Sequence, residues 1–194
     1  PTLARAKGAA RQAQCQSQLR QVSLATLLYA DEHEDQFPRS EHSALVYRQK
    51  TWGYAILPFL GYDGVTRTSS VWPAIFNRLY RCPEDRRTNQ WSYGLNVYFE
   101  LGADDDYRGS PATWRKRGSI LRPTDTILFG EMAGGADHIM AHFWAEDTHP
   151  EVATNRHRDR SEFVFVDGHV NLLPFHTTYN LSNGIDLWNP YRGL

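Results

Sequence analysis

The sequence predicts an α+β protein in which one long N-terminal helix packs by its C-terminal half against a small antiparallel β-sheet. Residues 1 to about 31 contain a single glycine and, after Pro1, no proline until Pro38. Short apolar runs separated by turn residues follow, and residues 163–173 carry a strong hairpin pattern. The 194 residues fit one domain, in which we distinguish a helical stem over 1–36 and a β-rich head over 37–194.

The two halves of the predicted helix differ in what they can bury. The second half is amphipathic, because apolar residues recur at spacings of three and four: Cys15, Leu19, Val22, Ala25 or Thr26, and Leu28 or Tyr29. In the first half Arg5, Lys7 and Arg11 interrupt the apolar residues, so we expect it to project from the body. Four acids over residues 31–35 and then Phe37-Pro38 mark the exit from the helix.

Shorter elements are expected along the rest of the chain. We predict a short helix over 52–61 ended by Gly61, a short helix or strand over 71–81, a strand over 91–101 with a possible bulge at Gly94, a long loop over 102–118, and strands over 126–129 and 138–145. In residues 163–173, β-branched and aromatic runs flank Asp167-Gly168. Asp-Gly favours a two-residue type I′ turn, because both central positions need a positive φ.

Composition excludes several classes of protein. The chain has 21 Lys and Arg against 22 Asp and Glu, so its net charge of −1 provides no field to hold nucleic acid. With 41% hydrophobic and 13% aromatic residues it is too apolar for intrinsic disorder. No run in the given sequence approaches the roughly 18 apolar residues of a spanning helix.

Histidines and tryptophans raise a second interpretation, in which the head binds a metal or a ligand. Five histidines lie close together in sequence: His138, His142, His149, His157 and His169. The pair His138 and His142 lacks the glutamate of a zinc-protease helix, and no nucleophile elbow or phosphate loop is present, so no catalytic residue is assigned. The six tryptophans are spread along the chain and fit core packing better than a carbohydrate platform.

Two further groups leave alternatives open. The adjacent carboxylates Asp104, Asp105 and Asp106 would repel unless solvated or neutralised by a hard cation, which makes them the calcium candidates. Cys15 and Cys82 belong to no Cys-x-x-Cys pair, so they are either two buried thiols or one disulfide.

An ordered set of motifs resembles a known family. Residues 3–7, 15–21 and 28–31 resemble the stem of type II secretion pseudopilin-like proteins with a prepilin-type N-terminus, which abound in Planctomycetes and Verrucomicrobia. The motifs Arg81-Cys82-Pro83, 92–96 (Ser-Tyr-Gly-Leu-Asn), 122–130 and Arg156-His157 follow in the order of that family. His157, nine residues and Asp167-Gly168 fit the His-x9-Asp-Gly signature of the prepilin-processing-associated domain.

The resemblance implies a pilin-like fold and a non-enzymatic function. It implies a structural subunit of a type II secretion pseudopilus or type IV pilin-like assembly, anchored in the inner membrane by an apolar helix half absent from this sequence, with a periplasmic head. The implied partners are prepilin peptidase, which cuts and methylates the precursor, and other pseudopilin subunits. The candidate subunit contacts are Leu3, Ala6, Ala10 and Ala13 with Arg5, Lys7 and Arg11.

The resemblance also assigns roles in the head. An exported head implies a Cys15–Cys82 disulfide that ties stem to head. Asp167-Gly168 would close the hairpin, and His157 would form a hydrogen bond at the strand entry and fix its register. Calcium at Asp104 to Asp106 is the one cofactor candidate. The alternative is an envelope metal-dependent hydrolase, or a head that binds carbohydrate or another substrate.

Overall fold

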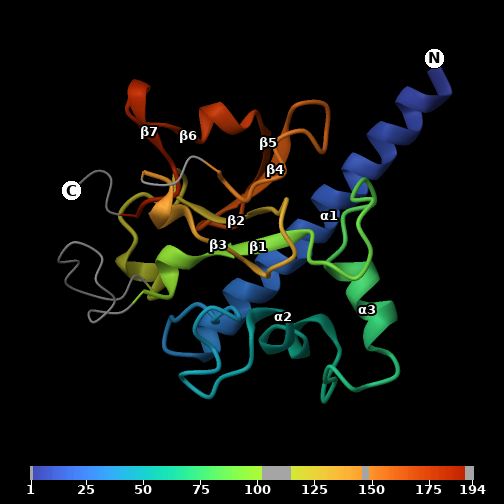
Figure 1. The fold of residues 1–194 in the computed structure, drawn as a ribbon. Helices are drawn as coiled ribbons and strands as arrows, with labels where there is room; N and C mark the ends of the chain where they lie inside the picture. The colour runs from blue at the N-terminus through green and yellow to red at the C-terminus, as the bar shows by residue number, and fades with distance from the viewer. Residues whose placement is uncertain (1, 102–114, 146–148, 191–194) are drawn as a thin grey trace.

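A computed structural model describes residues 2–101, 115–145 and 149–190, and its fold is a long helix laid across a five-stranded sheet (Figure 1). Helix α1 runs over Thr2–Glu32. The sheet has the strand order β3-β1-β2-β4-β5. This arrangement confirms the predicted α+β, pilin-like layout.

The strands of the sheet are short and all lie after residue 92: β1 Tyr93–Asn96, β2 Ile127–Glu131, β3 His138–Ile139, β4 Ser161–Phe165 and β5 Val170–Leu173. Neighbouring strands are antiparallel except that β3 pairs with β1 in parallel. The sheet is therefore mixed, not purely antiparallel. A second two-stranded ladder joins β6 (Tyr179–Asn180) to β7 (Ile185–Asp186).

Two short helices and several 3-10 turns complete the described part of the head. The helices are α2 (Trp52–Ala55) and α3 (Trp72–Leu79). The 3-10 turns are η1 Pro58–Leu60, η2 Val97–Phe99, η3 Arg117–Ser119, η4 Ala141–Phe143, η5 Phe175–Thr177 and η6 Leu181–Asn183. The helix expected over 52–61 is thus α2 and η1, ended by Gly61 at φ 81°. Residues 71–81 form a helix, whereas the strands expected over 91–101 and 138–145 each stop early in a 3-10 turn.

The buried stripe of α1 is the one that its apolar spacing predicts. Cys15, Leu19, Val22, Ala25 and Tyr29 are buried, and the stripe packs against β4, β5, α3 and η1. Leu28 is 39% exposed, so the last position of the stripe belongs to Tyr29. The side chains over residues 3–14 are exposed or half-buried, and this end of α1 extends beyond the head in Figure 1.

The sheet buries both of its faces, because successive residues of its strands enter two different cores. Leu128 and Val164 face the core that α1 covers, where Trp52 packs among Tyr80, Trp91 and Phe129. Ile127 and Phe163 face the opposite core around Trp188. Trp52 and Trp188 are fully buried, in agreement with their predicted packing role.

Gly94 is not the predicted bulge. It pairs directly with Gly130 of β2, and a Cβ on Gly94 would lie 2.5 Å from the sulfur of Met132. Glycine is needed there for close packing. The irregularity in the sheet lies instead in β2, where the register with β4 shifts between Ile127 and Phe129.

The hairpin over 163–173 is confirmed, but its turn differs from the predicted type I′ turn. The loop has three residues, Val166 to Gly168, and the N–H of Phe165 donates to the carbonyl of His169 (2.9 Å). Only Gly168 has a positive φ, 96°, as in a type I turn followed by a bulge. The extra residue is fixed from outside the hairpin, because the Val166 N–H donates to the Thr126 carbonyl (2.9 Å).

Candidate functional site

The exposed part of the stem is the first candidate functional surface. Leu3 is 68% exposed, and Ala6, Ala10 and Ala13 are exposed on the same segment. Further along α1, Leu24 is 60% exposed on the side away from the head. Leu24 lies outside the stripe that the apolar spacing predicts, and Leu28, one of the two alternatives for the last position of that stripe, is exposed as well. Within the described parts of the chain, every helix is too short or too polar to cross a membrane.

The second candidate is a buried cluster of four side chains in which the structure brings together Cys15, Cys82, Glu131 and His157. They come from α1, the segment after α3, the end of β2 and the segment before β4. All four residues are buried, and their potential ligand atoms lie within 4.8 Å of one another. Glu131 is the member that the sequence analysis missed.

Three of the distances in this cluster are short. The Cys15 sulfur lies 3.4 Å from Glu131 Oε1, the Cys82 sulfur lies 3.4 Å from His157 Nε2, and His157 Nε2 lies 3.3 Å from Glu131 Oε1. Both cysteines are free thiols here, in place of the disulfide expected from the resemblance. The two thiols are nevertheless neighbours, because a Cys15–Cys82 hydrogen bond joins them while Cys15 also contacts Glu131 and Cys82 also contacts His157.

The cluster perturbs the acidities of its members. Burial raises the pKa of the Cys15 thiol well above its usual value, whereas the hydrogen bond from Cys15 lowers the pKa of Cys82. Burial alone would lower the pKa of His157, but hydrogen bonds to Cys82 and Glu131 outweigh it and raise this pKa to about 10. Burial would raise the pKa of Glu131, and the hydrogen bond from His157 with the charge of Arg156 lowers it. The imidazole of His157, with its raised pKa, is thus held between Cys82 and Glu131, whose pKa values are both lowered.

A surrounding layer of polar groups fixes the orientation of the cluster. The Tyr93 hydroxyl, which donates to Gln18 Oε1 (2.7 Å), also lies 3.2 Å from the Cys15 sulfur, and the backbone N–H of Glu162 donates to Glu131 Oε2 (2.9 Å). Arg156 Nη1 lies 3.4 Å from Glu131 Oε1, and its Nη2 lies 3.2 Å from Asp85. A buried carboxylate with two anchored oxygens and a neighbouring guanidinium has little freedom to rotate.

The residues of the His-x9-Asp-Gly signature lie at the two ends of β4, and both ends contact α1. At one end, His157 joins the cluster that contains Cys15. At the other end, the Gly168 carbonyl accepts a hydrogen bond from the Ser23 hydroxyl (3.0 Å). A Cβ on Gly168 would lie 2.9 Å from Leu27 Cδ1, so glycine permits this close approach. Asp167 caps the turn by accepting from the backbone N–H of His169 (3.1 Å). The signature therefore docks β4 along the stem.

The other histidines do not join this cluster. His138 lies 3.0 Å from Asp137 Oδ1, and its ring packs edge-to-face near His42 at 5.7 Å. His169 stacks on Phe165 at the hairpin. The four-residue cluster is the group with metal-ligand spacing found among the described residues. Asp104, Asp105 and Asp106 lie outside the described residues.

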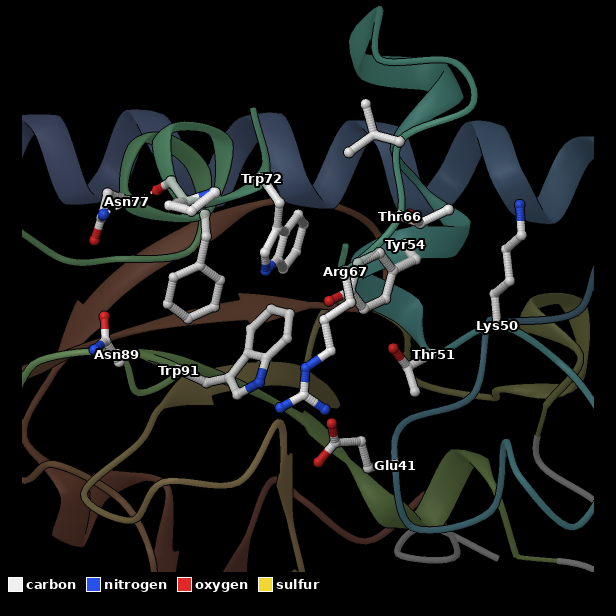
Figure 2. Close-up of a pocket in the computed structure, with 13 residues that line it drawn as sticks. Glu41, Lys50, Thr51, Tyr54, Thr66, Arg67, Trp72, Asn77, Asn89 and Trp91 are labelled. Carbon is white, nitrogen blue, oxygen red and sulfur yellow. Dashed lines mark hydrogen bonds between the residues drawn. The ribbon is translucent and has the colours of Figure 1, made fainter. Parts of the chain in front are cut away.

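A pocket of about 570 Å³ forms a third candidate, on the side of the head near α2 and α3. Figure 2 shows Tyr54, Trp72 and Trp91 along one wall, with the Arg67 guanidinium directed toward the Glu41 carboxylate at the other. The rings of Tyr54 and Trp72 stack at 4.4 Å. Burial and the charge of Asp137 raise the pKa of Glu41, and Arg67 opposes that shift.

The pocket adds a surface role to the packing role predicted for the tryptophans, because Trp91 is buried in the core and Trp72 packs against it. Trp72 and Trp91 come from distant parts of the sequence, yet their rings meet at 6.3 Å in this wall. Polar side chains surround the aromatic wall: Lys50, Thr51, Thr66, Asn77 and Asn89. No local pattern in the sequence signals the pocket, because the segments around Tyr54, Trp72 and Trp91 meet only in the folded head.

A long stem helix packed on a mixed sheet, with a buried polar cluster between them, defines an α+β protein of pilin-like layout. Residues 4–137 match the model of a family described as "Protein of unknown function (DUF1559)". The match covers more than half of the chain, which therefore belongs to the DUF1559 family. It includes Cys15, Cys82 and Glu131 and ends before His157. Searches of curated proteins and of solved structures gave no match.

Proposed function

We propose that this protein is a non-catalytic structural subunit of a pilin-like assembly in the bacterial envelope, of the type II secretion pseudopilus or type IV kind. The observation that carries the proposal is the division of α1. Its second half buries a stripe on the head, whereas residues 3–14 are exposed or half-buried and their N-terminal end extends beyond the head (Figure 1). A helix that presents one half to its own domain leaves the other half for neighbouring stems.

The exposed surface of α1 supports this role by its composition. Leu3 and the small residues Ala6, Ala10 and Ala13 permit close helix–helix approach, and Leu24 adds exposed apolar surface further along the stem. In the proposal these residues contact other subunits. An apolar segment before residue 1 anchors the protein in the inner membrane, prepilin peptidase processes the precursor, and the head lies in the periplasm.

Processing provides the first test. We expect the protein isolated from its native cells to begin with an N-methylated residue that opens an apolar stretch of about 20 residues before Pro1. Intact mass and N-terminal sequencing measure this directly. An unmethylated native chain that begins near Pro1 would contradict the proposal.

Assembly provides the second test, in the full-length precursor in its native cells. Leu3→Asp adds a charge to the exposed stem, so we expect much less protein in the sheared filament fraction with unchanged thermal melting. Leu45→Asp is the matched control, because Leu45 is 87% exposed on the head. Equal filament yields from Leu3→Asp, Leu45→Asp and the unchanged protein would refute the role of the stem.

The aromatic pocket favours a second candidate function, a head that binds carbohydrate. Stacked aromatic rings beside a carboxylate, a guanidinium and amide groups suit the apolar faces and hydroxyls of a sugar. Titration with maltose, cellobiose and diacetylchitobiose, followed by tryptophan fluorescence, tests it. Binding lost in Trp72→Ala but kept in Leu45→Ala would support it, and no saturable change with any of the three sugars would count against it.

A further inference from the structure

We propose that Cys15, Cys82, Glu131 and His157 bind one zinc ion, which fastens the stem helix to the head. The four side chains supply two sulfurs, one imidazole nitrogen and one carboxylate oxygen. These are the donor types of structural zinc sites, which are four-coordinate and closed to solvent. The inference does not depend on the proposed assembly function.

Three of the six donor–donor distances match tetrahedral coordination, and all six lie within 4.8 Å. With zinc about 2.3 Å from sulfur and about 2.0–2.1 Å from nitrogen or oxygen, tetrahedral geometry separates sulfur from nitrogen or oxygen by about 3.5 Å and nitrogen from oxygen by about 3.3 Å. The two sulfur contacts are 3.4 Å, Cys15 to Glu131 and Cys82 to His157, and the His157–Glu131 distance is 3.3 Å. These three edges already have the lengths that an occupied site requires.

The charges around the cluster balance when zinc is bound. Two thiolates and the Glu131 carboxylate carry three negative charges, and a neutral His157 adds none. The ion contributes two positive charges, and Arg156, 3.4 Å from Glu131, contributes the third, because its other neighbour Asp85 has its own partner in Arg87 at 2.5 Å. In this buried position a balanced set of charges avoids the cost of an unpaired ion.

The surrounding groups hold the donors as outer-shell partners do in metal sites. The Glu162 N–H binds Glu131 Oε2, which leaves Oε1 to face the cysteine and histidine donors. The Tyr93 hydroxyl, held by Gln18 Oε1 at 2.7 Å, packs 3.2 Å from the Cys15 sulfur and leaves the lone pairs of that sulfur for the ion. Such contacts orient ligands and raise metal affinity.

The donor set selects against the other common ions. Calcium and magnesium prefer cages of oxygen atoms, and this site has one carboxylate oxygen among four donors. Two thiolates with one imidazole suit zinc, and four protein ligands leave no open position for catalysis. A Cys15–Cys82 disulfide is the competing state, because it consumes both sulfurs and excludes the ion.

The test uses the whole chain, purified once without reductant and once with a non-chelating reductant, then incubated with zinc sulfate and desalted. We expect native mass spectrometry to find one zinc per chain in both samples. X-ray absorption should give two sulfur and two nitrogen or oxygen neighbours at about 2.3 and 2.0 Å. A chain without metal whose mass is two hydrogens low before reduction, or a desalted chain with well under one zinc, would overturn the proposal.

Variants locate the ion. Cys82→Ser and His157→Ala should weaken zinc affinity more than about a hundredfold, beyond the 10–100-fold typical of outer-shell changes. The control is His169→Ala, whose half-exposed ring lies on the hairpin outside the cluster, and it should keep one zinc per chain. Equal zinc binding by all three variants would overturn the assignment.

A spectrum of the unaltered protein keeps the proposal testable if the cluster variants do not fold. Cobalt(II) in place of zinc should give the intense visible bands of a tetrahedral ion and a near-ultraviolet band from thiolate-to-cobalt charge transfer. Zinc should displace both. Weak octahedral bands without the thiolate band would overturn the proposal.

Discussion

Replacement of Leu19 by alanine tests whether the stem helix is held by packing against the head. Leu19 is fully buried in the core between α1 and the sheet. The change removes three carbon atoms and leaves a cavity that the surrounding elements fill only in part, which costs about 2–5 kcal/mol of the free energy of unfolding. At about 2–4 °C per kcal/mol for a chain of this size, the melting temperature should fall by about 4–20 °C.

The matched control is Leu24→Ala, the same chemical change on the same helix at a side chain that is 60% exposed. It should stay within about 0.5 kcal/mol of the unchanged protein. Urea unfolding followed by circular dichroism measures both, at one fixed zinc concentration because a bound ion adds its own stability. Equal losses for Leu19→Ala and Leu24→Ala would refute the packing argument, and so would full stability of Leu19→Asp.

Two further predictions concern the hairpin and the acid sensitivity of the head. Gly168→Ala should lower the free energy of unfolding by about 1–3 kcal/mol, because φ of Gly168 is 96° and the new Cβ meets Leu27. Adding Leu27→Ala to this variant should recover only the part of the loss that comes from the contact with Leu27. Full stability of Gly168→Ala in thermal melting would contradict backbone strain at this position. Burial would raise the pKa of Asp85, but the hydrogen bond from Arg87 holds it well below its usual range. Because the pKa of Asp85 is lower in the folded than in the unfolded protein, this carboxylate stabilises the fold fully above the unfolded-state pKa of about 3.9. That contribution is lost as the pH falls from this value through the folded-state pKa. Asp85→Asn should therefore melt lower at pH 7 and approach the unchanged protein near pH 2, and a constant difference across this range would show that the carboxylate charge is not the cause.

Local sequence patterns were sufficient to predict the elements in which apolar residues follow a regular spacing. The buried stripe of α1 follows from the spacing of Cys15, Leu19 and Val22. The hairpin follows from two apolar runs around Asp167-Gly168. Its turn was predicted incorrectly because the hydrogen bond from Val166 to Thr126, which lengthens the loop, is a tertiary contact that the local sequence does not encode.

The buried cluster was only partly predictable. Cys15, Cys82 and His157 each stood out in the sequence, as a possible disulfide and as part of a signature. Glu131 ends the apolar strand β2 and has no motif of its own. Glu131 and Cys15 are 116 positions apart in the chain. They come together only because β2 pairs with β4 in the sheet on which α1 packs.

The contacts of β4 with the stem also determine the order in which the chain can fold. Ser23 of α1 and Gly168 are 145 positions apart. The first helix of the chain to be synthesised therefore packs against strands that are synthesised near the end. Contacts over so long a sequence separation slow folding, because the long loop must close before they can stabilise it. A chain emerging N-terminus first can cover part of the apolar stripe of α1 with η1 and α3, but the part that packs on β4 and β5 stays uncovered until those strands arrive. Truncations that end before residue 161 should leave that stripe open to aggregation, even though they contain the entire stem.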